Sequence, residues 1–322
     1  MAGFMNVPGS SPHSASIRFG CLLLAGLVAL LAAGCASPHG AAKTERNVVY
    51  GQAGGKELLL DIFLPPSAEG LRPVAVSLHG GGWSYGAKWN GQGLLATSEL
   101  LKRGYVFVSI NYRLAPRHKF PAQIEDAKCA IRFLRAHAAQ YQLDSDRIAA
   151  LGSSAGGHLA ALLGTTDTSA GFEGGGGWTN ESSRVQAVVD MFGPADLLYG
   201  VQHKETWAIL ANEVFGSKTS EEILRRASPV TYVSKDDPPF LLLHGDHDSL
   251  VPLVQSELME AALRKAGVPV ELIVVKNAGH CFIPAGRPPS PTDAEIGKLI
   301  ADFLDRTMPR EIQQTGVRDL RP

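Results

Sequence analysis

The amino-acid sequence predicts an α/β protein with a mostly parallel central β-sheet flanked by helices. Short apolar runs typical of buried strands alternate with longer segments whose apolar residues recur at helical spacing. Of the 322 residues, 45% are apolar and 19% are charged, which is an ordinary globular composition. Strands and helices that alternate in this way pack as a parallel sheet with helices on both faces.

The first two expected strands, at residues 47–50 and 57–64, are joined by a glycine-rich turn and should form an antiparallel hairpin. Six further apolar runs are expected to be strands: 74–78, 106–110, 148–151, 185–191, 240–243 and 272–275. Helical spacing is present at 127–138 and 251–261, and Thr292 begins a capping box ahead of the last helix.

Two segments interrupt this alternation. Residues 171–183 are rich in glycine and are expected to form a surface loop. Residues 193–239 contain two short helical patterns, at 206–214 and 220–226, and are long for a simple connection. They are therefore expected to be a small insertion between the sixth and seventh strands that covers part of a cleft.

The N-terminal residues 1–34 have the pattern of a secretory signal peptide. Their single charge, Arg18, precedes an apolar run at 21–33, which is shorter than the roughly 20 residues needed to span a bilayer. The run leads into a sequence similar to the lipobox of bacterial lipoproteins, with Leu31 displaced by one position. This similarity predicts lipid attachment to Cys35.

Acyl chains on Cys35 would anchor the protein to a membrane, and Ala36 after it resembles the outer-membrane sorting signal of Gram-negative lipoproteins. The expected location is the bacterial outer membrane or cell envelope. Ordinary signal cleavage is the alternative, and it would leave a periplasmic or secreted protein. Residues 35–46 are expected to be a tether, 47–307 the folded domain and 308–322 a polar tail.

Charge, cysteine content and histidine spacing bear on whether the protein binds nucleic acid, contains a disulfide or holds a metal or cofactor. The 30 basic and 31 acidic residues leave no basic surplus, which argues against a nucleic-acid partner. Cys129 and Cys281 are expected to be buried free thiols, and a disulfide between them is the alternative. The histidines have no metal-ligand spacing and no glycine-rich phosphate loop follows a strand, so neither a metal nor a cofactor is expected.

Ser154 lies at a predicted sharp turn between a strand and a helix. Gly152, Ser154 and Gly156 match the pattern G-x-S-x-G, between the strand run 148–151 and a helical run at 155–163. Glycines are needed because a Cβ would press on the strand or helix beside a serine held at strained dihedral angles. The pattern predicts a nucleophile elbow that lifts the Ser154 hydroxyl clear of the sheet.

A second glycine cluster, HGGGW at residues 79–83, directly follows the strand run 74–78. Successive glycines let backbone N–H groups approach a bound carbonyl oxygen. Together with the N–H of Ala155, they are expected to form an oxyanion hole. Trp83 is expected either to line the cleft or to pack beneath it.

A serine hydroxyl becomes a good nucleophile when a histidine takes its proton and a carboxylate orients that histidine. Asp248 and His280 each follow an expected strand, at the sheet edge where open α/β sheets bind ligands. The order Ser154, Asp248, His280 is also the order in which proteins with such an elbow place these groups.

Other residues compete for these roles. Asp246 is two positions from Asp248, and Asp196 follows the sixth expected strand, so both are alternative acids. His79 and His244 are expected to brace loops through hydrogen bonds.

Taken together, these motifs resemble α/β-hydrolase esterases, near the hormone-sensitive-lipase-like and feruloyl-esterase-like (BD-FAE-type) groups. The similarity extends from about residue 47 to residue 304. It rests on HGGGW (79–83), NYRLAP (111–116), FPAQIEDAKCAIRFLR (120–135), GSSAGGHLA (152–160), SPVTYVSKDDPPFLLLHGDHDSLVP (228–252) and GHCF (279–282). The resemblance implies the α/β-hydrolase fold and a catalytic triad of Ser154, His280 and Asp248. It also implies three oxyanion donors, the amides of Gly81, Gly82 and Ala155.

The sequence departs from this pattern at two positions. Ser153 stands where the lipase-like group usually has aspartate, which favours the feruloyl-esterase-like group, and Cys281 replaces the commoner glycine after the histidine. No large N-terminal cap is expected. Arg113 and Asp126 are expected to form a structural ion pair.

The resemblance implies a serine carboxylester hydrolase that forms an acyl-enzyme with short-chain acyl, acetyl-sugar or hydroxycinnamoyl esters. Two alternatives stay open. One is amide or formamide hydrolysis by the same triad, as in arylformamidases. The other is an inactive hydrolase scaffold that serves as a surface binding lipoprotein. The sequence leaves the oligomeric state open.

Overall fold

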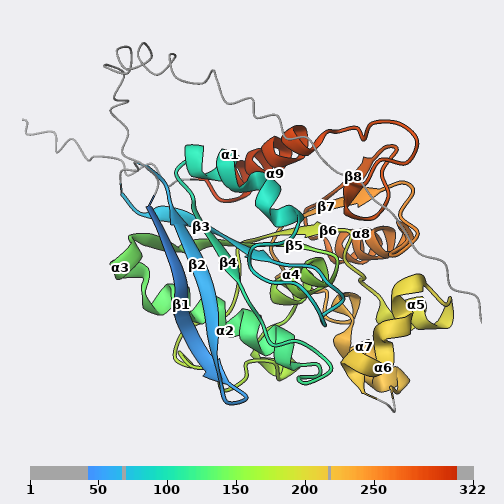
Figure 1. The fold of residues 1–322 in the computed structure, drawn as a ribbon, viewed down its shortest axis with the longest axis horizontal. Helices are drawn as coiled ribbons and strands as arrows, with labels where there is room; N and C mark the ends of the chain where they lie inside the picture. Colours follow the sequence, from blue (N-terminus) through green and yellow to red (C-terminus); the bar gives the residue numbers. More distant parts are fainter. Residues whose placement is uncertain (1–42, 67–69, 217–218, 310–322) are drawn as a thin grey trace, which may run out of the picture. The chain divides into compact units, whose positions relative to one another are not determined.

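The computed structural model describes residues 43–66, 70–216 and 219–309. The described strands are β1 (Lys43–Ala53), β2 (Lys56–Leu64), β3 (Arg72–Leu78), β4 (Val106–Ile110), β5 (Leu143–Ser153), β6 (Ala187–Met191), β7 (Phe240–Gly245) and β8 (Val270–Val275). They form one sheet in the order β1-β2-β4-β3-β5-β6-β7-β8 (Figure 1). β1, β2 and β4 pair antiparallel and all later pairs are parallel, so the predicted mostly parallel sheet is confirmed.

The predicted strands are all present. β4 has the predicted ends, and each of the other strands is shifted at one or both ends. β1 begins at Lys43, which pairs with Leu64 of β2, so the last residues of the expected tether belong to the sheet. The predicted signal peptide 1–34 and Cys35 lie outside the described residues, as does the polar tail from residue 310 onward. Within the described residues, no helix is long and apolar enough to cross a membrane.

Helices cover both faces of the sheet, as predicted. The described α-helices are α1 (Thr97–Lys102), α2 (Ala122–Ala136), α3 (Ala138–Tyr141), α4 (Ala155–Thr165), α5 (Leu197–Gln202), α6 (Ala211–Phe215), α7 (Glu221–Ala227), α8 (Val254–Ala266) and α9 (Asp293–Thr307). The capping box predicted at Thr292 is formed with Glu295 at the start of α9.

The two faces of the sheet carry separate apolar cores. On one face, Leu100 of α1 and Ile300 of α9 belong to a buried cluster with Phe107 of β4, and Figure 1 shows these two helices side by side. On the other face, helices α2 and α4 pack on the sheet, with Leu159 in the same cluster as Val76. Full burial of one such aliphatic side chain stabilises the fold by about 1.5–3 kcal/mol.

The insertion predicted between the sixth and seventh strands is present. It contains α5, a 3₁₀ helix η3 (Thr206–Leu210), α6 and α7. The helical patterns predicted at 206–214 and 220–226 correspond to η3 with α6 and to α7, whereas α5 was not predicted. The side chain of Asp196 caps α5 by accepting a hydrogen bond from the amide of Tyr199.

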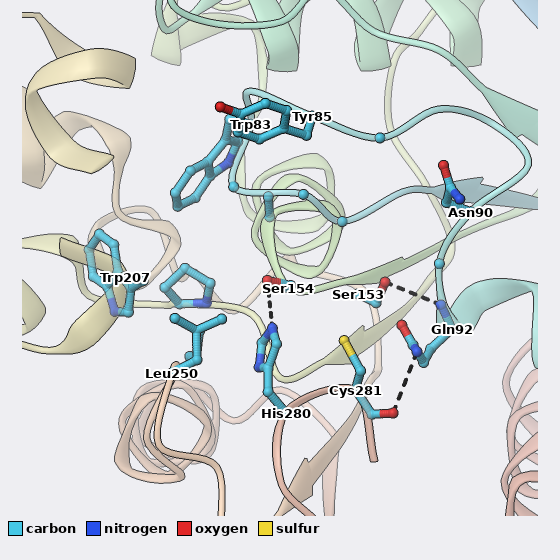
Figure 2. Close-up of a pocket in the computed structure, with 18 of the residues that line it drawn as sticks. Trp83, Tyr85, Asn90, Gln92, Ser153, Ser154, Trp207, Leu250, His280 and Cys281 are labelled. Atoms are coloured by element: carbon cyan, nitrogen blue, oxygen red, sulfur yellow. Dashed lines mark hydrogen bonds between the residues drawn. The ribbon is translucent and has the colours of Figure 1, made fainter. Parts of the chain in front are cut away.

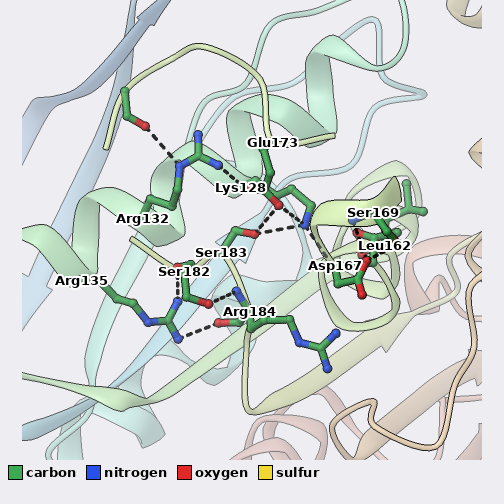
Figure 3. Close-up of polar contacts among 12 residues, drawn as sticks. Lys128, Arg132, Arg135, Leu162, Asp167, Ser169, Glu173, Ser182, Ser183 and Arg184 are labelled. Atoms are coloured by element: carbon green, nitrogen blue, oxygen red, sulfur yellow. Dashed lines mark hydrogen bonds and ion pairs between the residues drawn. The ribbon is translucent and has the colours of Figure 1, made fainter. Parts of the chain in front are cut away.

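The glycine-rich segment 171–183 is more than the surface loop that was expected. Its Glu173 carboxylate pairs with two buried cations of α2, Lys128 at 2.9 Å and Arg132 at 2.6 Å (Figure 3). Burial lowers the pKa of Lys128, although its contact with Glu173 opposes that shift. Phe172 beside this pair is fully buried. Loss of one partner would leave a buried charge uncompensated, which typically costs about 3–5 kcal/mol, so the ion pairs hold the segment on α2.

β3 marks the point at which the strand order reverses. The chain passes from β3 to β4 on one side and then returns to place β5 on the other side of β3. Loops that follow such strands diverge and leave a crevice at the carboxyl edge of the sheet. The HGGGW segment at 79–83 follows β3, and Ser154 follows β5, so the topology places both predicted motifs at this crevice.

Candidate active site

Ser154 stands at a sharp turn between β5 and α4. Its backbone has φ 55° and ψ −121°, a strained conformation for a residue with a side chain. A Cβ on Gly152 would overlap the carbonyl oxygen of Gly156, and a Cβ on Gly156 would overlap that of Leu78. The Ser154 amide donates a hydrogen bond to the carbonyl of Met191 at 2.8 Å. The turn therefore forms because glycines allow strand and helix to approach so closely.

Three predicted side chains form one hydrogen-bonded chain. Nε2 of His280 lies 3.1 Å from Oγ of Ser154 (Figure 2), and Nδ1 of His280 lies 2.7 Å from Oδ2 of Asp248. The other carboxylate oxygen of Asp248 accepts hydrogen bonds from the amides of Leu250 and Val251, both at 2.9 Å. A carboxylate on Nδ1 fixes the tautomer in which Nε2 accepts the serine proton.

The Asp248 carboxylate is stabilised in its ionised form. Burial alone would raise its pKa, but contacts with His244 and His280 and the amide of Val251 hold the pKa well below its usual range. His244 is buried, and its Nε2–H donates to the carbonyl of Val251 at 2.8 Å while lying 3.5 Å from Oδ2 of Asp248. Its Nδ1 therefore accepts the hydroxyl of Ser256, at 2.7 Å. His244 braces the acid loop, as expected.

The alternative acids and His79 occupy other positions. Asp246 accepts hydrogen bonds from the amide of Ala278 at 3.2 Å and from a neighbouring histidine, within the turn that follows β7. Asp196 caps α5. His79 contacts the carbonyl of Gly80, and burial lowers its pKa to about 4. In the described part of the chain, none of the three is hydrogen-bonded to the Ser154–His280 pair.

The loop after β3 presents backbone amides beside Ser154. Gly81 and Gly82 have φ of 113° and 57°, and a Cβ on Gly82 would lie 2.5 Å from Cδ1 of Leu210. Within residues 43–309 as described, the amides of Gly81, Gly82 and Ala155 donate to no backbone or side-chain acceptor. These residues and Ser154 line one pocket, so the three predicted donors are free to bind a negative oxygen there.

Trp83 both lines the pocket and packs beneath its loop. Its Nε1–H donates to Nδ1 of His158 at 3.1 Å, and Nε2–H of His158 donates to the carbonyl of Ala227 at 2.7 Å. Burial lowers the pKa of His158 to about 4, which keeps it neutral at pH 7. His158 lies in the GSSAGGHLA segment, but its role was not predicted from the sequence. It connects the oxyanion loop (residues 79–83) to α7, and both of its partners, Trp83 and Ala227, are distant from it in sequence.

The pocket has a volume of about 570 Å³ and two chemically different ends. Its apolar end is lined by Trp83, Pro194, Trp207, Leu210 and Leu250. Its polar end is lined by Asn90, Gln92, Ser153 and Cys281. Figure 2 shows Trp207 and Leu250 on one side of Ser154, and Asn90, Gln92 and Cys281 on the other. Trp207 and Leu210 come from the insertion, which therefore covers part of the cleft as expected.

The polar end includes contacts that the sequence did not reveal. The amide of Gln92 donates to Oγ of Ser153 at 3.3 Å, and its side-chain amide reaches the carbonyl of Cys281 at 3.5 Å. Cys129 and Cys281 are free thiols, but Cys281 is only half-buried and faces the pocket, which corrects the expectation that both are buried. Among the described residues, no group of three or more His, Cys, Asp or Glu side chains could hold a metal ion.

The expected ion pair of Arg113 and Asp126 is present, with Nη2 and Oδ1 2.8 Å apart. Asp126 also accepts a hydrogen bond from the amide of Arg113, so the pair fixes the chain after β4 to α2.

Comparison with known proteins identifies the family. Residues 60–263 match the family model BD-FAE. The chain belongs to the BD-FAE family. It is 37% identical over 264 residues to Esterase LipQ of Mycobacterium tuberculosis, a match that covers 80% of this chain and 61% of LipQ. It is 36% identical over 243 residues to the probable carboxylic ester hydrolase LipM of the same organism, covering 73% of this chain and 56% of LipM. This BD-FAE member thus spans about three fifths of the length of these relatives.

Solved structures confirm the α/β-hydrolase fold. A truncated form of a carbohydrate esterase from gut microbiota superposes with a TM-score of 0.70 at 29% identity, covering 84% of this chain and 99% of that one. Thermogutta terrifontis esterase 2 phosphoramylated by tabun superposes with a TM-score of 0.68 at 28% identity, covering 84% of this chain and 97% of that one. The resemblance of this BD-FAE member to α/β-hydrolase esterases is confirmed.

Proposed function

We propose that this protein is a serine carboxylester hydrolase. The observation that carries the proposal is the hydrogen-bonded chain from Asp248 through His280 to Ser154, which ends beside three free backbone amides in one pocket. The names of LipQ and LipM support it, as does the esterase that tabun phosphoramylates, because organophosphates react with activated nucleophiles.

The geometry supports a two-step acyl transfer. His280 Nε2 accepts the proton of Ser154 as Oγ attacks the ester carbonyl, and the free amides bind the oxygen that becomes negative. His280 then gives this proton to the leaving alcohol, and the acyl group stays on Ser154. Water attacks the acyl-enzyme by the same route and releases the acid. Asp248 stays ionised throughout and stabilises the imidazolium.

The pocket supports small ester substrates. Its volume of about 570 Å³ is in the range of pockets that hold small molecules. The apolar end formed by Trp83, Trp207 and Leu250 suits a short acyl chain or an aromatic ring, and the side-chain amides of Asn90 and Gln92 at the other end suit hydroxyl groups. Short-chain acyl, acetyl-sugar and hydroxycinnamoyl esters fit this division.

The cellular location is also part of the proposal. The signal pattern at 1–34 and the lipobox-like sequence support export, with lipid attachment at Cys35 and anchoring in the bacterial outer membrane or cell envelope. Membrane fractionation of the full chain and its Cys35→Ser variant tests this. Loss of membrane association in the variant is the expected result, and equal association of both proteins would contradict it.

Covalent labelling tests the enzymatic proposal. The protein and its Ser154→Ala variant are treated with a fluorophosphonate probe, their intact masses are measured, and hydrolysis of p-nitrophenyl acetate is followed. One adduct and turnover are expected for the unmodified protein. The variant should take up no probe, and its kcat should fall by about 10⁴-fold or more, since removal of a serine nucleophile has effects of this order. A folded protein without an adduct would contradict the role of Ser154. Matched acetate and acetanilide substrates separate ester from amide hydrolysis.

A further inference from the structure

One wall of the apolar end is an indole ring that is supported from behind. Trp207, in η3 of the insertion, lines the pocket and is almost fully buried. Figure 2 shows it on the same side of Ser154 as Leu250. A Cβ on Gly200 of α5 would overlap Cζ2 of the indole, so the ring rests directly on the backbone of that helix. The ring therefore separates the pocket from α5 and bounds the apolar end on that side.

The indole N–H of Trp207 is bonded to a buried carboxylate. Glu205 is 8% exposed, and its Oε2 accepts the Nε1–H of Trp207 at 2.6 Å. Its two oxygens also accept hydrogen bonds from the Nε2 group of Gln255, at 3.0 and 2.9 Å. A buried carboxylate costs stability unless hydrogen bonds compensate it, and a bonded network of this kind rigidifies its surroundings. The network therefore holds the indole in one orientation.

Gln255 also fixes a second wall of the apolar end. It lies in α8, is fully buried, and its Oε1 accepts the amides of Ala195 and Asp196, both at 2.8 Å. Pro194, the residue before Ala195, lines the pocket. One buried side chain thus connects the loop that carries Pro194 with the carboxylate that holds Trp207.

The fixed walls of the apolar end present carbon atoms to a ligand. The N–H of Trp207 is bonded to Glu205, and the N–H of Trp83 is bonded to His158, so both indole donors at this end are already used within the protein. The alkyl part of an acyl group has no polar atom and matches such a surface. Each buried methylene increases affinity by roughly fourfold, so the length that the walls can accommodate determines which acyl group is favoured.

We propose that Trp207 limits the length of the acyl chain at the apolar end, and that the buried Glu205–Gln255 pair holds Trp207 in this position. Trp207 contacts the substrate, whereas Glu205 and Gln255 act through it as positioning residues. The proposal rests on the proposed esterase function and deepens it, because it assigns the acyl group to the apolar end and names the residues that restrict it.

Removal of the indole tests the proposal. Rates are measured with the p-nitrophenyl esters of acetate, butyrate and octanoate. Trp207→Ala opens the space in front of Gly200, so kcat/KM for octanoate relative to acetate should rise by about tenfold or more, the effect of about two further buried methylenes. Trp207→Leu makes a smaller change of the same kind if the alanine variant does not fold. Ile209→Ala is the matched control, because Ile209 lies in the same η3 but is 85% exposed, and it should keep the ratio.

Gly200→Ala makes the opposite change. Its methyl group suits a helix but would overlap the indole of Trp207, so the ring must shift away from α5 and toward the pocket. The kcat/KM for butyrate relative to acetate should therefore fall by about fourfold, the effect of one methylene that is no longer buried. Opposite shifts in Gly200→Ala and Trp207→Ala would show that the position of the ring sets the limit.

Glu205→Leu and Glu205→Gln test the positioning pair. Leucine removes both acceptors and releases the indole, whereas glutamine keeps one oxygen for the Nε1–H of Trp207. The octanoate-to-acetate ratio of kcat/KM should rise by about fourfold in Glu205→Leu and return toward the unmodified value in Glu205→Gln. A merely structural role would lower the melting temperature and the folded fraction without changing this ratio, because the amount of folded enzyme cancels in it.

Binding to a catalytically silent protein separates this proposal from the esterase function. Calorimetry measures the affinities of butyrate and octanoate for the full chain carrying Ser154→Ala, with and without Trp207→Ala. The preference for octanoate over butyrate should increase by about tenfold or more in the double variant. This comparison requires no turnover.

Each outcome decides the proposal. Acetate turnover with an unchanged octanoate-to-acetate ratio in Trp207→Ala overturns it and leaves the esterase function standing. If Trp207→Ala instead changes the preference among alkyl acetates of different alcohol length, the apolar end holds the alcohol and the assignment is wrong. If the unmodified protein hydrolyses no ester, the esterase proposal fails and the carboxylate affinities decide alone. An equal preference with and without Trp207→Ala, or no binding of either acid, then overturns the role of Trp207.

Discussion

The turn after β5 is held mainly by close backbone packing, whereas the loops after β7 and β8 are held mainly by hydrogen bonds to carboxylates. In the first half of the site, a Cβ on Gly152 or Gly156 would overlap a carbonyl oxygen. In the second half, Asp248 binds His280 and two amides, and Asp246 binds the amide of Ala278. Gly245, which packs on the carbonyl of Ala278, is an exception to this division.

This difference predicts how each half responds to change. Packing of backbone against backbone has no charge to titrate, so the first half should not accept an added methyl group, and its pH dependence should come from the buried Asp190. A network of ionised and hydrogen-bonded groups should accept changes of shape more readily than changes of charge. A substitution that adds volume in the first half and one that removes charge in the second half therefore test backbone packing and carboxylate hydrogen bonds separately.

Gly152→Ala is expected to have the largest effect. Its methyl group would overlap the backbone of Gly156, so the turn that carries Ser154 must open. Because a shift of about 1 Å at reacting groups costs roughly 100-fold in rate and this turn also packs the sheet, we expect no measurable turnover and a strong loss of stability. Turnover of p-nitrophenyl acetate and thermal unfolding measure both. Gly175→Ala is the control, since its Cβ would meet nothing within 4 Å. Normal turnover in Gly152→Ala would show that packing does not hold this half.

Asp248→Asn is the matching change of charge in the second half. It keeps the volume of the side chain but removes the negative charge that orients His280 and stabilises the imidazolium. Such a change typically lowers kcat by about 10⁴-fold. The melting temperature should fall far less than in Gly152→Ala. Asp246→Asn is the control, because Asp246 bonds Ala278 and not His280. If Asp246→Asn lost more activity than Asp248→Asn, the assignment of the acid would be wrong.

The division between backbone packing and polar contacts also explains what the sequence could predict. Strands were predictable from continuous apolar runs, and parallel strands bring their carboxyl ends to one edge. Ser154, Asp248 and His280 could therefore be placed together from their positions after strands. The glycines of the elbow were predictable from the G-x-S-x-G pattern, although only Gly152 is required by a local contact, because a Cβ on Gly156 would meet Leu78 of β3.

Contacts made between distant segments were not predictable in this way. His158 lies in a helix that is apolar on all sides, and its bonds to Trp83 and Ala227 depend on where the oxyanion loop and α7 meet. The attachment of segment 171–183 to α2 likewise depends on Glu173 meeting two cations of that helix. Neither the hydrogen bonds of His158 nor the ion pairs of Glu173 can be predicted from periodicity. Both join residues that are brought together only by the complete fold.

Asp190→Asn tests a charged group inside the closely packed half. Asp190 accepts a hydrogen bond from the amide of Gly193 at 2.9 Å. Burial raises its pKa from 3.8 to about 6, although that amide and the nearby His244 oppose the shift. The folded state therefore binds this proton more tightly than the unfolded state. Its stability contribution is complete below pH 4 and is lost as the pH rises to about 6, by roughly 3 kcal/mol.

The Asp190→Asn variant lacks this titration. Its stability relative to the unmodified protein should therefore rise by about 3 kcal/mol between pH 4 and pH 7.5, whatever constant offset the amide introduces. Urea unfolding at several pH values measures the difference. If the difference in unfolding free energy between the two proteins were the same at every pH, Asp190 would not titrate in this range. It would then contribute no pH dependence to the stability of the first half.

His244 offers the smallest and most specific test of the polar half. Its Nε2–H donates to Val251 beside the Asp248 carboxylate, while its Nδ1 accepts from Ser256. Gln at this position can place an amide N–H near the Nε2 site, and Asn can place one near the Nδ1 site.

If His244 acts by positioning Asp248, His244→Asn should lower kcat by about tenfold, the equivalent of one lost hydrogen bond, with KM within about twofold. His244→Gln should recover most of this loss. The two variants share the loss of the imidazole ring, so a purely structural role would lower both melting temperatures alike and leave kcat of the folded fraction unchanged. If both variants had the same kcat as the unmodified protein, His244 would not position Asp248. His280 and the two loop amides would then be the groups that hold it.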